Sequence, residues 1–231
     1  MSKRTFFCKG VPFSPNVISD EAYDEMMRQR QQAERADMIE RYRNACFSDK
    51  TLRRCTFETD DRAHSELTRI ARDYVQNFDD NLKNGRGLLF YGTVGTGKTF
   101  ISACIANALV NQGYSCKMTT FTRIYNDLLA TFEKQACIDK LKRYDLLIID
   151  DLAAEGNTEY MRSAVFDVID NRYRSGKPII VTTNLTGDEL IQPSDIYQSR
   201  VYSRIFEMCL PYRVVGDDRR KAKLKAILEQ R

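Results

Sequence analysis

The fold is decided by the stretch Gly92-Thr93-Val94-Gly95-Thr96-Gly97-Lys98-Thr99, which lies between an apolar run at 88–91 and a helical pattern that begins at Phe100. Its spacing, G-x-x-x-x-G-K-[ST], is that of a phosphate-binding loop, because the glycines let the backbone N–H groups line a nest for phosphate oxygens. The start of the following helix attracts the same anion. We prefer this interpretation to a plain glycine turn, because the full spacing stands between a strand signal and a helix signal.

All eight residues of this loop are therefore predicted to bind a nucleotide. Lys98 is expected to reach the terminal phosphates with its amino group, as a point charge. The Thr99 hydroxyl is expected to hold Mg²⁺.

The composition narrows the class of protein. A chain of 231 residues can bury a full core, and it fits one α/β domain with an appendage better than two equal domains. The net charge of +4 does not by itself indicate nucleic-acid binding. The seven cysteines contain no C-x-x-C pair, which favours reduced thiols over a zinc site or a disulfide framework. Since we find no secretory signal and no apolar run that could span a bilayer, we expect a soluble, cytoplasmic protein with no membrane partner.

The first part of the chain differs from the rest. Residues 1–20 are predicted to form an extended, proline-interrupted arm, and residues 21–43 a helix whose broken apolar stripe leaves it mostly solvated. That helix is either an ordinary solvated surface or a surface for a partner protein, and its residues do not decide between the two. The helical pattern fails around 47–57, where basic residues cluster. We therefore predict an N-terminal arm and polar helix over 1–54 and a nucleotide-binding domain over 55–231.

Strands alternate with helices through the second region. This order is typical of parallel βαβ crossovers, so the predicted fold class is α/β, with a mainly parallel five-stranded sheet covered by helices on both faces. A charged link is predicted at 139–143. The predicted strands are 88–91, 116–120, 146–149, 178–181 and 206–215, and the predicted helices are 64–78, 100–110, 121–134, 158–174 and 218–230.

Two acidic residues follow the buried run at 146–149, and a phosphate loop needs a carboxylate at this position to place its metal ion. Asp150 is predicted to help hold Mg²⁺, and Asp151 to orient and deprotonate the attacking water. Glu155 is a reserve candidate for the second role. Asn184 ends the next buried strand at the same sheet edge, where α/β sheets bind their ligands. It is either a hydrogen-bond donor to the γ-phosphate or the water, or a plain strand-end cap.

These motifs, in this order, resemble the AAA+ ATPases of the bacterial helicase-loader group, the DnaC/DnaI and IstB-like proteins. The resemblance runs from about Cys55 to Arg220. It rests on Arg54-Cys55-Thr56-Phe57-Glu58, the phosphate loop, Tyr144-Asp145-Leu146-Leu147-Ile148-Ile149-Asp150-Asp151-Leu152, Thr182-Thr183-Asn184-Leu185, Ser199-Arg200-Val201-Tyr202-Ser203-Arg204-Ile205 and Gly216-Asp217-Asp218-Arg219-Arg220.

The resemblance implies roles that the residues alone do not. It makes ATP and Mg²⁺ the cofactors, Asn184 the sensor 1 residue and Arg220 the sensor 2 residue. It makes Arg204 an arginine finger that reaches the nucleotide of a neighbouring subunit, so that hydrolysis is coupled to self-assembly. The second acidic residue is Asp151, where the family often has glutamate, so slow hydrolysis is expected. The N-terminal region has no cysteines that match the zinc module of some loaders.

For nucleic acid, the resemblance implies contacts with single-stranded DNA from two segments, the predicted helix at 121–134 and the loop after Asp151. Phe132, Thr158 and Tyr160 are the corresponding residues, and aromatic side chains beside basic ones suit sequence-independent stacking of bases. Phe132 also continues the apolar face of its predicted helix, so a place in the core is the equal alternative.

We expect a replication accessory ATPase that binds ATP, Mg²⁺ and single-stranded DNA and helps to load a replicative helicase. Bound ATP would favour a multimer bridged by Arg204, and hydrolysis would release it. Three alternatives stay open: an IstB-like transposition helper, a small-molecule P-loop kinase, and a binding module whose ATPase is inactive because of Asp151.

Overall fold

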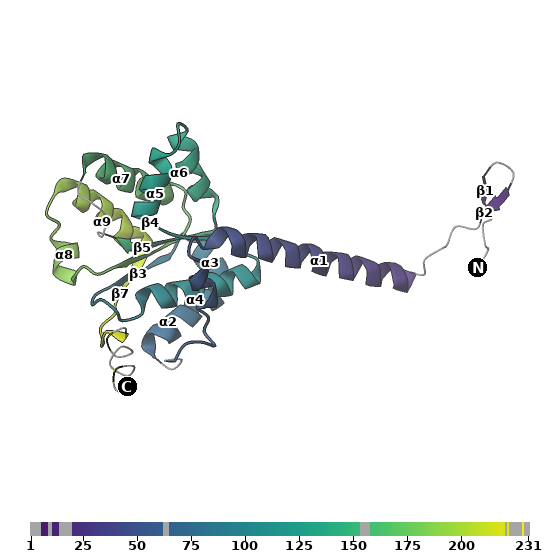
Figure 1. The fold of residues 1–231 in the computed structure, drawn as a ribbon, viewed down its shortest axis with the longest axis horizontal. Coiled ribbons are helices and arrows are strands. Elements are labelled where there is room, and N and C mark those ends of the chain that lie inside the picture. The colour runs from purple at the N-terminus through teal and green to yellow at the C-terminus, as the bar shows by residue number, and fades with distance from the viewer. Residues whose placement is uncertain are drawn as a thin grey trace.

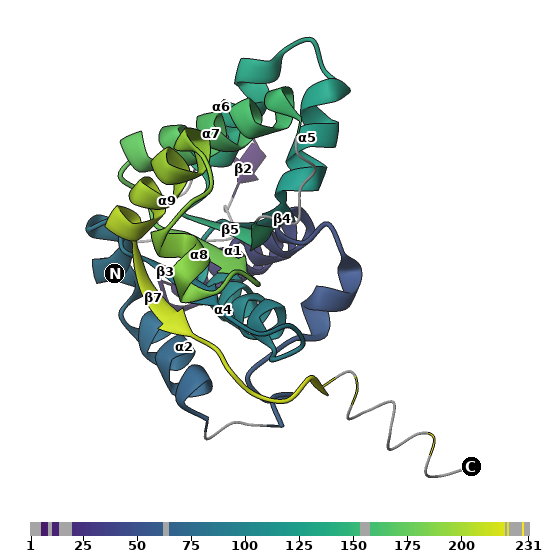
Figure 2. The same ribbon diagram turned by 90° about the vertical axis from the view of Figure 1, so that its left-hand side faces the viewer.

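The computed structural model describes residues 6–8, 11–13, 20–61, 65–152, 158–219, 221 and 228. Its centre is a five-stranded parallel sheet with strand order β4-β5-β6-β3-β7. Helices cover both faces of this sheet (Figures 1 and 2). The predicted α/β class, with a parallel sheet between helices, is therefore confirmed. The strands are β3 (Gly87–Tyr91), β4 (Cys116–Thr120), β5 (Leu146–Leu152), β6 (Ile179–Thr183) and β7 (Cys209–Arg213).

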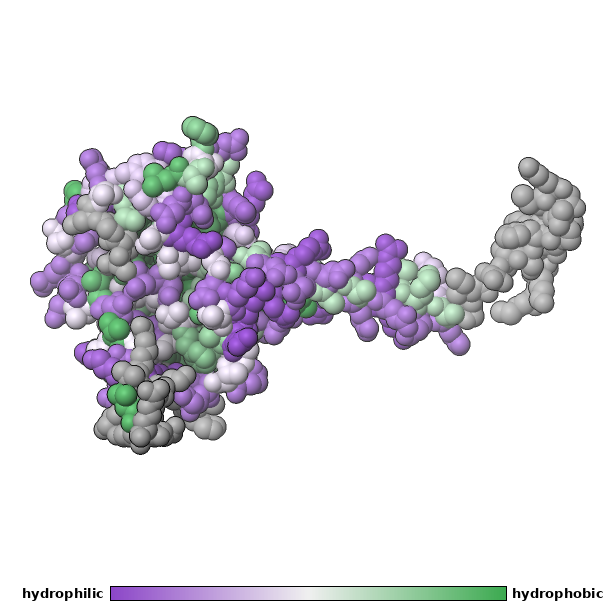
Figure 3. Space-filling view, viewed as in Figure 1, coloured by the Kyte–Doolittle hydropathy of each residue, from purple (hydrophilic) through white to green (hydrophobic). Residues whose placement is uncertain are grey.

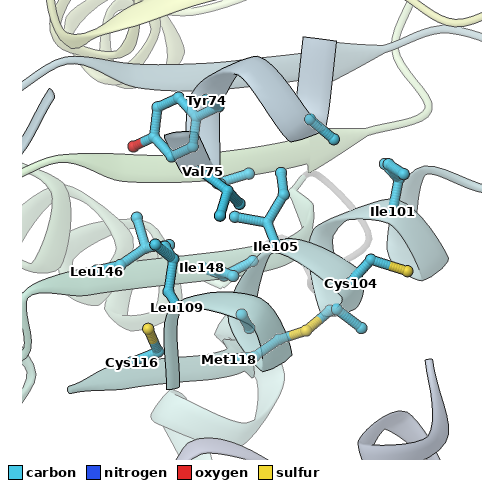
Figure 4. Close-up of a cluster of buried hydrophobic side chains, with 14 of the residues drawn as sticks. Tyr74, Val75, Ile101, Cys104, Ile105, Leu109, Cys116, Met118, Leu146 and Ile148 are labelled. Atoms are coloured by element: carbon cyan, nitrogen blue, oxygen red, sulfur yellow. The ribbon is translucent and has the colours of Figure 1, made fainter. Parts of the chain in front are cut away.

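One face of the sheet is covered by α2 (Glu66–Gln76) and α4 (Lys98–Gln112). Alternate strand residues such as Leu88 and Ile148 point to this side, as expected for the period of a strand. Figure 4 shows packed side chains from both helices and from β4 and β5. The labelled residues are Tyr74, Val75, Ile101, Cys104, Ile105, Leu109, Cys116, Met118, Leu146 and Ile148.

The other face is covered by the remaining helices of the domain, and their buried residues form a second cluster with strand residues such as Leu89 and Val181. The two clusters show why the central strands β3, β5 and β6 are mostly apolar, since a parallel sheet is buried on both sides. These helices are α5 (Phe121–Leu129), α6 (Lys134–Arg143), α7 (Glu159–Arg174), α8 (Gly187–Ile191) and α9 (Ile196–Met208), and a short α3 (Phe78–Lys83) follows α2.

The helix α1 (Asp20–Cys46) extends away from the sheet (Figure 1), and hydrophilic side chains cover most of it (Figure 3). Its last residue, Cys46, and the following Phe47 are buried in the core, and Phe47 forms a parallel bridge with Met118. The 3₁₀ helix η1 (Lys50–Arg54) follows, and a short β1–β2 hairpin (Phe6–Cys8, Val11–Phe13) precedes. The helical N-terminal extension is thus confirmed. Its division from the rest at 54/55 stays a prediction, and Cys46 and Phe47 make contacts across that division.

Two predicted boundaries between 121 and 143 are wrong. The helix predicted over 121–134 ends at Leu129, where the Thr131 hydroxyl accepts a hydrogen bond from the backbone N–H of Glu133 instead, at 3.1 Å. The charged link predicted at 139–143 belongs to α6, whose residues Cys137, Ile138 and Leu141 pack on the second cluster. Because charged residues fill the rest of α6, its apolar stripe was too short to recognise.

The last predicted strand also begins too early. Phe206 lies in α9, which continues to Met208, and β7 starts at Cys209. Buried residues at 201, 202 and 205 give α9 a helical stripe that continues almost to the strand, so no polar turn marks the boundary.

Candidate nucleotide-binding site

The phosphate loop has the backbone shape that its glycines predicted. Gly97 caps α4 with φ 99°, a left-handed conformation that side chains rarely adopt. Gly95 has φ 78°, and a Cβ there would lie 2.1 Å from Oδ1 of Asp218. The loop therefore needs glycine at 95 both for its backbone angle and for the close approach of the C-terminal segment.

The amino group of Lys98 lies inside this loop. Its Nζ donates hydrogen bonds to the backbone carbonyls of Gly92, at 2.9 Å, and Thr93, at 2.7 Å, and the residue is almost fully buried. A terminal phosphate would compete with these two neutral carbonyls for the ammonium group. Charge-assisted bonds to phosphate are stronger, which favours the exchange.

Thr99 and Asp150, the two residues predicted to hold Mg²⁺, are 51 residues apart in the sequence and in contact in the structure. The Thr99 hydroxyl donates to Oδ1 of Asp150 at 3.0 Å, and the Thr182 hydroxyl donates to the same oxygen at 2.7 Å. Burial raises the pKa of Asp150, while the two hydroxyl hydrogen bonds act in the opposite direction.

This donor set fits Mg²⁺, which is usually bound by one or two protein oxygens together with water and substrate phosphates. Among the described residues there is no group of three or more His, Cys, Asp or Glu side chains that would form a metal cage. A site built from Thr99, Asp150 and phosphate oxygens needs none.

Asp151 is held in an unusual conformation. Its φ is 61°, the only positive value of a non-glycine residue in the described part of the chain, and the register of β5 with β6 shifts between Ile149 and Leu152. The backbone N–H of Asp151 donates to the Thr182 hydroxyl at 2.9 Å, and Nδ2 of Asn184 donates to Oδ1 of Asp151 at 2.7 Å. The two carboxylates thus have different partners, since Asp150 accepts from Thr99 and Thr182 and Asp151 accepts from Asn184.

A cavity of about 800 Å³ lies over these groups, and this volume falls within the usual range for ligand pockets. Eight of the predicted site residues line it, from the phosphate loop and from the ends of β5 and β6. They are Gly95, Thr96, Gly97, Lys98, Thr99, Asp150, Asp151 and Asn184.

Four further lining residues were not predicted: Asp61, Phe100, Thr182 and Arg219. Arg219 forms an ion pair with Asp61, its backbone N–H donates to the Gly95 carbonyl at 3.1 Å, and its guanidinium lies 5.7 Å from the centre of the Phe100 ring. Arg219 and Thr182 belong to motifs that the sequence analysis used, but the functional roles were assigned to Arg220 and Asn184 in the same motifs. Asp61 had no local signal, since only folding brings it to the cavity.

Of the two predicted catalytic arginines, only Arg204 is among the described residues, and it does not line this cavity. Arg220 and the reserve candidate Glu155 lie outside the described residues. Arg204 lies on α9 and is not among the cavity residues; its Nε donates to Oδ1 of Asp170 at 2.7 Å. The structure thus brings Lys98, Asp150, Asp151 and Asn184 together and keeps Arg204 apart from them.

The aromatic residues expected to contact DNA lie near α5, α6 and the start of α7. Phe132 is fully exposed, so the alternative that it belongs to the core is wrong. Tyr160 packs edge-on against Tyr125, with ring centres 5.6 Å apart, and the Lys134 ammonium lies 4.6 Å from the centre of the Tyr160 ring. Thr158 caps α7, accepting a hydrogen bond from the backbone N–H of Met161 at 3.3 Å.

In the described part of the chain, no helix combines the length and the apolar character needed to cross a membrane. The six cysteines with described side chains are free thiols, and four of them are buried. They are Cys46, Cys55, Cys104, Cys116, Cys137 and Cys209.

The sequence matches a known family over most of its length. The model of the family described as "IstB-like ATP binding protein" matches residues 15–224. The replicative helicase loader DnaI of Bacillus subtilis (strain 168) is 29% identical over 161 residues, which are 64% of this chain and 51% of DnaI. The replicative helicase loader DnaC of Escherichia coli (strain K12) is 27% identical over 180 residues, 71% of this chain and 72% of DnaC. The match to this chain therefore spans only about half the length of DnaI.

Solved structures show the same fold. A crystal structure of DnaI has a TM-score of 0.62 at 22% identity and covers 78% of this chain and 99% of that one. The structure of AMPPCP-bound DnaA from Aquifex aeolicus has a TM-score of 0.55 at 25% identity and covers 75% of this chain and 55% of that one. Both are similar to this chain in overall fold.

Proposed function

The chain belongs to the family of IstB-like ATP-binding proteins, and from this premise we propose that it is an ATPase that helps to load a replicative helicase onto single-stranded DNA. One observation carries the ATPase part of this proposal. Lys98, Thr99 and Asp150 meet at the floor of one cavity, with Asp151 and Asn184 beside them. This is the set of groups that phosphoryl transfer to water requires.

The roles of the residues follow from their contacts. Lys98 would leave the carbonyls of Gly92 and Thr93 for the terminal phosphate oxygens of ATP. Thr99 and Asp150 would hold Mg²⁺, which neutralises charge on the transferred phosphoryl group when it is bound.

The proposed role of Asp151, the second of the two acidic residues, is to activate the attacking water. Asp151 would accept the proton of this water as a general base. Asn184, which donates to one oxygen of Asp151 at 2.7 Å, would orient that carboxylate and leave its other oxygen for the water. An aspartate reaches less far than a glutamate by one methylene, so hydrolysis is expected to be slow.

Arg204 is proposed to complete the site of a neighbouring copy of the chain. It is separate from the cavity of its own chain, so it would contribute to hydrolysis only across an interface between copies. An arginine supplied in this way stabilises the charge of the transition state, so hydrolysis would depend on assembly.

The DNA-binding part of the proposal is supported by the aromatic side chains near α5 and α6. Phe132 and Tyr160 would stack on bases, and Lys134 would contact a phosphate. Binding by stacking and charge of this kind tolerates any base sequence and weakens as salt is raised.

The helicase part rests on the relatives, two of which are named replicative helicase loaders. The region proposed to contact the helicase is residues 1–54, because α1 extends from the body with Tyr23 and Met26 exposed on it. A transposition helper is the second candidate, because the family description names IstB-like proteins. Affinity capture from the native host separates them: a hexameric helicase supports the loader, and a transposase in its place contradicts it.

The ATP-binding claim is tested by Lys98→Ala. We expect loss of ATP binding by at least about tenfold, measured with a fluorescent nucleotide on the full chain, because the charge-assisted bonds to phosphate disappear. The control is Lys142→Ala, a lysine in the last turn of α6 that does not line the cavity. Unchanged affinity in Lys98→Ala would refute nucleotide binding at this loop.

A further inference from the structure

Helices α7 and α9 are joined by a row of side-chain contacts that lies outside the nucleotide cavity. The contacts recur at intervals of three or four residues along α7 and within α9, so they lie on one face of each helix, and the first of them involves the N-cap of α9. Each contact pairs a residue of α7 with a residue of α9 or of its N-cap. The pairs are Arg162 with Asp195 at 3.2 Å, the Phe166 ring with the Arg200 guanidinium at 4.4 Å, Asp170 with Arg204 at 2.7 Å, and Tyr173 with Glu207 at 2.7 Å.

Arg204 is fixed from three directions within this row. Its Nε donates to Oδ1 of Asp170, its Nη1 donates to the backbone carbonyl of Arg200 at 3.2 Å, and its Cζ lies 4.8 Å from the centre of the Phe166 ring. Its side chain is 22% exposed. Nη2 donates no hydrogen bond to the described residues, so Nε and Nη1 hold one edge of the guanidinium and the N–H groups of Nη2 are left as donors.

Asp170 does not depend on Arg204 for a counter-charge. Its carboxylate is only 12% exposed and also binds Nε of Arg174 at 2.7 Å, from a side chain that is 73% exposed. A carboxylate buried to this extent needs a cationic partner, and Arg174 supplies one. The contact with Arg204 is therefore not needed to neutralise Asp170, whereas Asp170 is the carboxylate that orients Arg204.

We propose that Asp170 is a positioning residue for Arg204, and that it holds the guanidinium ready for the nucleotide of a neighbouring copy of this chain. The proposal rests on the proposed function, in which Arg204 acts across the interface. A free arginine loses much side-chain entropy when it is fixed, so a guanidinium that is already oriented binds a developing negative charge at lower cost.

The test uses steady-state hydrolysis of ATP by the full chain in its assembled state. Asp170→Ala is expected to lower kcat about tenfold with KM unchanged, because Arg204 is displaced while the cavity is intact. Asp170→Asn, which keeps an oxygen acceptor and the size of the side chain, is expected to be intermediate. The control is Arg162→Gln, which breaks another contact of the same row and is expected to keep kcat.

Mixing of subunits separates positioning from damage to the fold. Asp170→Ala subunits keep an intact cavity, and Asp151→Asn subunits keep an intact Arg204. An equal mixture of these two impaired variants should therefore restore full activity at about a quarter of its interfaces if assembly is random. A variant damaged in its own cavity would not be rescued in this way.

The outcomes distinguish the two proposals. Rescue by Asp151→Asn subunits together with unchanged KM supports the positioning role. Full activity of Asp170→Ala while Arg204→Ala is inactive overturns the positioning role alone, and so does an equal loss in Arg162→Gln. Full activity of Arg204→Ala contradicts the trans arginine of the proposed function, and the role of Asp170 falls with it.

Discussion

At the scale of single residues, Thr182 links the two acidic groups of the candidate site. Its hydroxyl donates to Asp150, the predicted metal ligand, and accepts from the backbone N–H of Asp151, so one side chain contacts both acidic residues. Thr183, its neighbour, is equally buried, but its hydroxyl donates to the Leu152 carbonyl at 2.8 Å. The two threonines therefore differ in what they contact and not in burial.

Thr182→Val is expected to lower the rate of ATP hydrolysis about tenfold, because both acidic groups lose their common partner. It should also lower the free energy of unfolding by about 1–3 kcal/mol, since the N–H of Asp151 is left without its acceptor. The control Thr183→Val should have a similar cost in stability and keep the hydrolysis rate. Equal rates for the two variants, measured by phosphate release, would contradict this role of Thr182.

Some residues of the candidate site could be predicted from the sequence and others could not. Lys98, Asp150 and Asn184 were predictable, because each stands at a fixed distance from a strand end or a glycine loop. The positive φ of Asp151 was not predictable, since the register shift that causes it depends on pairing between β5 and β6. Asp61 reaches the cavity only because the chain folds back, so no local pattern indicates it.

At the scale of elements, the side chain of Arg172 on α7 binds backbone carbonyls at the N-terminal ends of β5 and β6. Its guanidinium donates to the carbonyls of Tyr144 and Asp145 before β5 and to that of Pro178 before β6, at 2.5–3.1 Å. Burial lowers its pKa to about 10, which is still far above neutral pH, so the group stays charged. A planar fork with several donors is needed to bind carbonyls from two segments at once.

Arg172→Lys is expected to lower the free energy of unfolding by about 3 kcal/mol, because an ammonium group cannot satisfy all of these carbonyls. Urea unfolding followed by circular dichroism measures the change. Arg174→Lys, on the same helix with its side chain mostly exposed, is the control and should change stability by less than about 0.5 kcal/mol. If Arg172→Lys lowers the free energy of unfolding no more than Arg174→Lys does, the hydrogen bonds from Arg172 to these carbonyls do not contribute to stability as proposed.

The prediction for DNA binding concerns Phe132, which lies between α5 and α6, and Tyr160, which lies in the first turn of α7. Replacing Phe132 or Tyr160 by alanine should weaken binding of single-stranded DNA by about 1–3 kcal/mol each, because a stacked base loses its platform. Fluorescence anisotropy with a labelled oligonucleotide at two salt concentrations measures it. Ile191→Ala removes a similarly exposed apolar side chain from α8 and should leave affinity unchanged. If Phe132→Ala and Tyr160→Ala bind the oligonucleotide as tightly as the control Ile191→Ala, these aromatic residues do not contact DNA.

At the scale of the whole molecule, α1 joins the body only through its C-terminal end. Ile39 and Tyr42 pack on the core, and Cys46 and Phe47 lie within it, whereas the helix before Met38 is mostly exposed. We therefore expect the part of this helix before Met38 to contribute little to the stability of the fold, and its exposed side chains to be accessible to a partner.

Removal of residues 1–37 should change the free energy of unfolding by less than about 0.5 kcal/mol and keep ATP affinity, while capture of the helicase is lost. Removal of residues 1–47 deletes Phe47 as well, and it should destabilise the domain by at least about 3 kcal/mol. Urea unfolding and affinity capture measure these effects. Retained capture of a helicase by the shorter chain would exclude 1–37 as its binding region.

The sequence by itself determined the class of fold and the phosphate end of the site. Both depend on local rules, since glycine spacing sets the loop and apolar periodicity sets buried strands and helices. Only the tertiary structure decided that Asp61, Thr182 and Arg219 line the cavity, that Phe132 is exposed, and that Arg204 pairs with Asp170 outside the cavity. These contacts join residues far apart in the chain, and their partners are set by how the helices pack on the sheet.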